Sequence, residues 1–173
     1  MVSWEDALVW CNALSELGGL VPAYRIGDPS GPPLRQAQRL RLDTWQRPEP
    51  GTKTLWPYRI AVDAAATGWR LPSAAERARF TGTPNAGDWR PPVADGATRM
   101  VTAGALVDGL ADLHGNVAEW LWQAGPCGLF GRPLGTGHWC SANPPDLRAF
   151  TMVDEHPLAA RPFIGFRVVR RVP

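Results

Sequence analysis

Three side chains that could take part in chemistry lie close together toward the end of the sequence: His138, Cys140 and Asp146. Residues two apart in an extended segment share a face, so the imidazole of His138 and the thiol of Cys140 could point the same way. Such a set could hold a metal ion or form a Cys–His nucleophile. It lacks the fixed spacing of a known metal or catalytic site. We therefore expect a hydrogen-bonded histidine and an inert thiol.

Two motifs stand on either side of these residues: GLADLHGNVAEW at 109–120 and IGFRVV at 164–169. Both resemble signatures of the formylglycine-generating-enzyme (sulfatase-modifying factor) family, and the segments 2–24 and 68–76 resemble that family as well. The resemblance implies a C-type-lectin-like fold, an α+β domain with two main helices, a small antiparallel sheet and much loop. Typical members carry an opening segment before the motif at Val2. We therefore expect a divergent, N-terminally shortened member with an uncovered surface.

The same resemblance says where an oxidase site would lie. Family members that oxidise cysteine to formylglycine bind Cu(I) through two cysteines that follow an RGGSY motif, because soft thiolates suit that ion. When Trp139 and Arg148 are aligned with the family's aromatic residue and arginine, Ser141 and Asp146 stand at the two cysteine positions. We therefore expect no copper site and no formylglycine-generating activity.

The GNVAEW loop implies a different ion. In the family, a glutamate and backbone oxygens around the Gly-Asn turn can hold a structural Ca²⁺, for which hard oxygen ligands are suited. The matching residues are Glu119 through its side chain, with backbone carbonyls near Gly115 and Val117. Alternatively, Glu119 and Asn116 only hydrogen-bond the loop backbone, as buried polar groups must. The sequence leaves both alternatives open.

Capping signals predict two helices that would support these loops. Ser3 followed by Asp6 is typical of a helix start, and Gly18-Gly19 of a helix end. The apolar positions between them are Trp4, Ala7, Leu8, Cys11, Leu14 and Leu17, at steps of three and four residues. Cys11 on this face is expected to be a packed core thiol. Ser73 and Glu76 predict a second, short helix, in which Arg77 replaces the tryptophan that the family carries.

The remaining segments are predicted to be short strands and loops. Residues 58–62 favour a strand, and the alternation in 164–169 favours an antiparallel strand at or next to a sheet edge. We expect one domain over residues 1–173, with 27–57 as a loop insertion. The chain holds 18 Gly, 18 Pro and nine Trp, which indicates ordered loops pinned by aromatic side chains.

Composition excludes several functional classes. The formal net charge of +2 gives no electrostatic case for nucleic-acid binding. We recognise neither a signal peptide nor an apolar stretch long enough to span a membrane. Three cysteines are too few for a disulfide framework. The expected location is therefore the cytoplasm.

We interpret the chain as a non-catalytic binding module for a protein partner, such as a toxin or a signalling protein, or for self-association; a bacterial toxin-immunity or conflict-system protein would fit. The predicted contact residues edge the former active cleft: Trp122, Phe130, His138, Trp139 and Arg148. One alternative is a metal-dependent oxidase or protein-modifying enzyme with a rearranged site. Another is a retroelement-diversified ligand-binding protein. Residues 140–163 contain one Asn and no Tyr, which argues against the latter.

Overall fold

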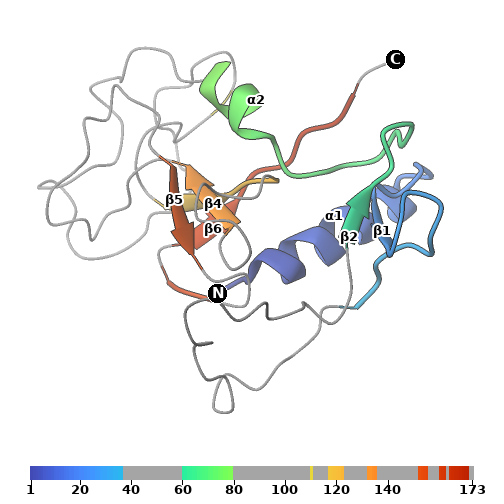
Figure 1. The fold of residues 1–173 in the computed structure, drawn as a ribbon, viewed down its shortest axis with the longest axis horizontal. Coiled ribbons are helices and arrows are strands. Elements are labelled where there is room, and N and C mark those ends of the chain that lie inside the picture. The colour runs from blue at the N-terminus through green and yellow to red at the C-terminus, as the bar shows by residue number, and fades with distance from the viewer. Residues whose placement is uncertain are drawn as a thin grey trace, which may run out of the picture.

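The computed structural model describes residues 1–36, 60–79, 110, 117–122, 132–135, 152–155, 160–162 and 164–171. Its helices are α1 (Trp4–Leu17) and α2 (Ala74–Arg79). Its strands are β1 (Tyr24–Ile26), β2 (Ile60–Val62), β3 (Ala118–Trp120), β4 (Arg132–Gly135), β5 (Met152–Glu155) and β6 (Ile164–Phe166). A two-stranded sheet lies by one end of α1 and a four-stranded sheet by the other (Figure 1). None of the helices in these ranges is long and apolar enough to cross a membrane.

Helix α1 begins and ends where its capping residues predict. The Ser3 hydroxyl accepts a hydrogen bond from the Asp6 N–H, and the Asp6 carboxylate accepts one from the Ser3 N–H, both at 3.1 Å. This reciprocal pair is a capping box. Gly18 is the C-cap, and Gly19 has a φ of 66°, which a residue without Cβ adopts at little cost. The predicted limits of this helix are confirmed.

The buried face of α1 is only partly the predicted one. Trp4, Ala7, Leu8 and Cys11 are buried, whereas Leu14 is partly buried and Leu17 is 87% exposed. The prediction that Leu17 faces the core is wrong. After Cys11 the buried positions of the helix are polar, Asn12 and Ser15, because their side chains hydrogen-bond backbone groups of neighbouring segments. The Asn12 amide donates to the carbonyls of Tyr24 and Leu34, each at 2.8 Å.

The four-stranded sheet has the order β5-β4-β3-β6. β3 pairs antiparallel with β4 and parallel with β6. The predicted strand at 164–169 exists and lies at an edge of this sheet, but the prediction that it is antiparallel is wrong. β4 also pairs antiparallel with β5. Strands β3, β5 and β6 therefore all run in the same direction, opposite to β4.

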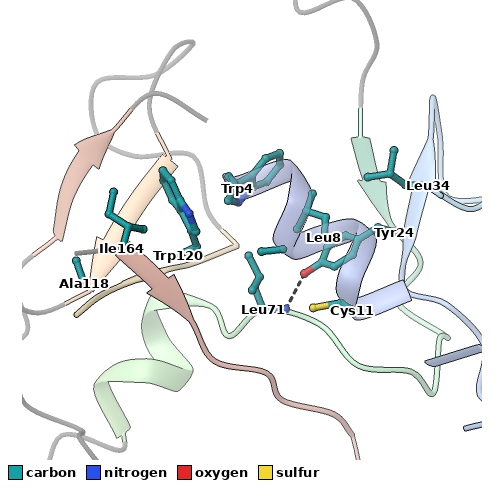
Figure 2. Close-up of a cluster of buried hydrophobic side chains, with 10 residues drawn as sticks. Trp4, Leu8, Cys11, Tyr24, Leu34, Leu71, Ala118, Trp120 and Ile164 are labelled. Atoms are coloured by element: carbon teal, nitrogen blue, oxygen red, sulfur yellow. Dashed lines mark hydrogen bonds between the residues drawn. The ribbon is translucent and has the colours of Figure 1, made fainter. Parts of the chain in front are cut away.

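The core joins α1 to both sheets (Figure 2). Its buried side chains include Trp4, Leu8, Tyr24, Leu71 and Trp120. The Trp4 indole donates to the Leu121 carbonyl at 3.0 Å, and the Trp120 indole donates to the carbonyl of Val2 at 3.1 Å. Each buried indole N–H is thereby satisfied. The two bonds fasten the start of α1 to strand β3.

The beginning of the predicted 27–57 insertion folds back on β1. The Ile26 N–H donates to the Pro32 carbonyl and the Leu34 N–H donates to the Tyr24 carbonyl, both at 2.9 Å. Leu34 is fully buried. Residues 37–57 lie outside the described residues, so the extent of the insertion stays a prediction.

Candidate functional site

Glu119, the residue that the resemblance implies as a calcium ligand, lies in a buried cluster with two arginines. The Arg77 Nε donates to Glu119 Oε2 at 2.8 Å, and the Arg167 Nη2 donates to Glu119 Oε1 at 2.8 Å. The side chain of Arg77 is 0% exposed and that of Glu119 is 7% exposed. We call these three residues the Arg–Glu–Arg cluster. It connects α2, β3 and the end of β6, which are far apart in the sequence.

Local signals place each member of the cluster. Ser73 and Glu76 form the second predicted capping box, and the two guanidinium nitrogens of Arg70 also donate to the Glu76 carboxylate. The Arg70 guanidinium is the main reason why the pKa of Glu76 falls to about 2. With α2 fixed in this way, Arg77 points into the protein. The predicted start of this helix is confirmed.

Pairing between β3 and β6 places the other two members. Glu119 lies opposite Gly165 in the parallel register. Residues two apart in a strand share a face, so Arg167 follows Gly165 on the side of Glu119. A Cβ at Gly165 would come within 3.2 Å of a Val117 methyl group, so the absence of a side chain there keeps the two strands close.

The cluster fits an ion pair better than a calcium site. Both carboxylate oxygens of Glu119 already accept hydrogen bonds from guanidinium groups. A divalent cation would have to displace at least one guanidinium group, and the positive charge of the remaining one would repel the cation. Val117 is described, but Gly115 lies outside the described residues, so the predicted set of backbone carbonyls stays untested. The Glu119 carboxylate as the structure holds it does not fit the calcium ligand that the resemblance implies.

Trp122, a predicted contact residue, follows β3 and packs against the core. Its ring stacks on that of Trp4, with 5.6 Å between centroids and 16° between planes, and lies 5.0 Å from that of Tyr24. The backbone N–H of Trp122 donates to the Pro72 carbonyl at 3.0 Å. The side chain is half-buried. Trp122 is therefore held rigidly, and only part of its surface is available to a partner.

The other predicted site residues lie outside the described residues: Phe130, His138, Trp139, Arg148 and Gly115, with Cys140, Ser141 and Asp146 of the copper argument. Their roles stay predictions. Among the residues that the structure does describe, no group of three or more His, Cys, Asp or Glu side chains could hold a metal ion.

Two buried titratable groups near the core are unsuited to catalysis. Burial raises the pKa of the Cys11 thiol to about 12, which makes the nucleophilic thiolate very rare at neutral pH. This agrees with its prediction as a packed core thiol. Burial also raises the pKa of the Tyr24 phenol, whose oxygen accepts a hydrogen bond from the Leu71 N–H at 2.7 Å (Figure 2). Both side chains support the fold.

The pairing of Glu119 with Arg77 and Arg167 was missed at the sequence level. One signal was present: Arg77 stands in a capped helix at a position where an apolar residue was expected. An arginine in such a place needs a buried carboxylate partner, and Glu119 is the acidic residue of the strongest motif.

No family model matches the sequence, and no curated protein matches it. Solved structures do. Treponema denticola variable protein 1 superimposes with a TM-score of 0.72 at 24% sequence identity, over 99% of this chain and 70% of that one. This chain has a C-type-lectin-like fold. A structure titled "Crystal Structure of CarF" matches with a TM-score of 0.66 at 26% identity, over 99% of this chain and 66% of the other.

The comparisons confirm a C-type-lectin-like α+β fold and leave the family assignment open. The matched structures are variable-protein folds rather than formylglycine-generating enzymes. Membership of the sulfatase-modifying factor family therefore stays a prediction from the two motifs.

Proposed function

We propose that this chain is a ligand-binding protein of the variable-protein type, in which a fixed C-type-lectin-like scaffold carries the segments that contact the ligand. The observation that supports this proposal most is the match to Treponema denticola variable protein 1 over 99% of the chain. Retroelement-diversified binding proteins use this fold. Of the functions considered from the sequence, the retroelement-diversified ligand-binding protein is the one that the structural matches support most.

The described framework has the rigidity that such a role requires. The Arg–Glu–Arg cluster joins α2, β3 and the end of β6 through charged hydrogen bonds at 2.8 Å. Stacking on Trp4 fixes Trp122, the second residue after β3. A binding surface held on rigid elements loses less conformational entropy when a ligand binds. We propose that the contacts come from Trp122 together with Phe130, His138, Trp139 and Arg148, and that the ligand is a protein.

Sequence variation between related isolates tests whether the chain is diversified. If it is, substitutions gather in residues 136–163, while Arg77, Glu119 and Arg167 stay unchanged, and a reverse-transcriptase gene lies nearby. The scarcity of Asn and Tyr in residues 140–163 is the observation that stands against this part of the proposal. Substitutions spread evenly over the chain would refute diversification without touching the binding role.

Site-specific crosslinking tests the binding role itself. A photo-reactive amino acid at position 139 should yield a specific adduct in the native host. The same group at Ala65, an exposed position in the turn after β2, is the matched control. Once the partner is identified, Trp139→Ala and Arg148→Ala should each weaken binding by about 2 kcal/mol, as is common for Trp and Arg at hot spots. Unchanged affinity with intact folding would place the binding surface elsewhere.

A further inference from the structure

Helix α1 has a second apolar side, away from the core. We call Trp10, Ala13, Leu14 and Leu17 the outer α1 face. Trp10 is 48% exposed, Leu17 is 87% exposed, and Ala13 is exposed as well. The four residues recur at steps of three, one and three, which aligns them in one stripe along a helix. An exposed apolar stripe on a helix that is already packed on its other side indicates an interaction surface.

One residue of the stripe, Trp10, is supported from outside the helix. The ring of Phe166 on β6 meets that of Trp10 edge-on, with centroids 5.3 Å apart and planes at 71°. The Phe166 contact supports the Trp10 ring from one side while nearly half of its surface stays open to solvent. A large aromatic ring held in this way is suited to a protein–protein contact.

We propose that the outer α1 face binds a second copy of this chain, with the two α1 helices antiparallel. The spacing of the stripe is self-complementary about its midpoint between Ala13 and Leu14. Around this point Trp10 of one copy meets Leu17 of the other, at both ends of the contact. The small Ala13 side chain near the axis lets the helices approach closely, and the same patch then serves both copies, as in a two-fold dimer.

Charge favours the antiparallel orientation. Asp6 lies exposed at the N-terminal end of the helix, whereas at the other end Glu16 is neutralised by its ion pair with Arg35 at 3.0 Å. Antiparallel helices place Asp6 of each copy toward this neutral pair of the other. A parallel pair would place Asp6 beside Asp6, where the two carboxylates repel each other. This inference does not depend on the proposed ligand binding.

Sedimentation velocity tests the dimer. The contact between two 14-residue helices is small, so we expect a dissociation constant on the order of 10 µM. The wild type should shift from monomer to dimer between ~1 and ~300 µM, which spans that constant. Leu17→Glu should raise the dissociation constant at least tenfold without lowering the melting temperature, because this side chain is almost fully exposed. Ala64→Glu, on the exposed turn after β2, is the matched control and should dimerise like the wild type.

Cysteine crosslinking tests the orientation, in the background Cys127→Ser/Cys140→Ser. Position 13 lies next to the two-fold axis, so Ala13→Cys should form a disulfide-linked dimer under mild oxidation. In the antiparallel pair the two copies of position 17 are about 10 Å apart along the helix axes, at 1.5 Å per residue, so Leu17→Cys should crosslink far more slowly. A wild type that stays monomeric at the highest concentration overturns the proposal, as does equal crosslinking at both positions. A face that serves a different protein would give that monomeric result.

Discussion

Replacing Glu119 with alanine would leave the guanidinium groups of Arg77 and Arg167 without their shared carboxylate in the interior. The structure allows the size of this effect to be estimated. Glu119 accepts hydrogen bonds from both arginines at 2.8 Å, and hydrogen bonds to charged groups contribute ~1.5–3 kcal/mol each. Removal of one partner from a buried ion pair typically costs ~3–5 kcal/mol. We expect Glu119→Ala to lower the free energy of unfolding by about 4 kcal/mol.

Two further variants separate charge from packing. Arg77→Met keeps most of the side-chain volume and leaves Glu119 paired with Arg167, so it should lower the free energy of unfolding by only about 1–2 kcal/mol. Glu16→Ala removes an ion pair of similar length, 3.0 Å to Arg35, whose partners are 37% and 71% exposed. Water screens that pair, and we expect a change below about 0.5 kcal/mol.

Urea unfolding followed by tryptophan fluorescence measures these differences. Trp4 and Trp120 are buried, so unfolding changes their emission. The reasoning is refuted if Glu119→Ala destabilises the protein no more than Glu16→Ala, because the cluster would then be as hydrated as the surface pair. An increase in the stability of the wild type on adding Ca²⁺, absent in Glu119→Ala, would contradict the assignment of this carboxylate to arginine.

Three further expectations follow from the buried polar contacts. Asn12→Ala should lower the free energy of unfolding by about 2–3 kcal/mol, because it removes three hydrogen bonds to the backbone of Tyr24 and Leu34. Urea unfolding measures this loss, and a loss smaller than that of Glu16→Ala would contradict the expectation. The Cys11 thiol, with its pKa raised to about 12, should react with a thiol reagent only as fast as the protein unfolds. The measurement uses the variant Cys127→Ser/Cys140→Ser, in which Cys11 is the remaining cysteine, and immediate labelling would disprove its burial. Arg70 lowers the pKa of Glu76 from 4.5 to about 2, so the contribution of Glu76 to folding stability is fully present above pH 4.5 and is lost as the pH falls toward 2. The stability difference between the wild type and Glu76→Gln should therefore shrink over that range. A difference that stays constant with pH would refute this expectation.

The parts of the fold that could be predicted from the sequence are those set by neighbouring residues. Both capping boxes, at Ser3 and Ser73, depend on residues three positions apart, and both helices begin where these signals indicate. The direction of β6 was predicted wrongly because it depends on how the chain returns from β5. Leu17 was assigned to the core because apolar spacing alone does not show which of two apolar sides is buried.

The candidate site shows the same division. The GNVAEW motif identified Glu119 as the central acidic residue. Its partners come from positions 42 and 48 residues away, and no local pattern connects them. The resemblance suggested calcium for this carboxylate, whereas arginine guanidinium groups bind it in the structure. Arg77, in a place where the family has an apolar residue, was the observation that could have indicated this.

The two indole hydrogen bonds at the start of α1 have a consequence for how the chain folds. Trp4 and Trp120 each donate to a carbonyl on the other's segment, across 117 and 118 residues of sequence. Loop closure over such distances costs conformational entropy before any contact is gained, and proteins with many distant contacts fold slowly. During synthesis, α1 leaves the ribosome long before β3 exists, and its buried face has no partner until then. We infer that the buried face of the first helix stays exposed until β3 has been synthesised, which leaves the growing chain open to aggregation during that time.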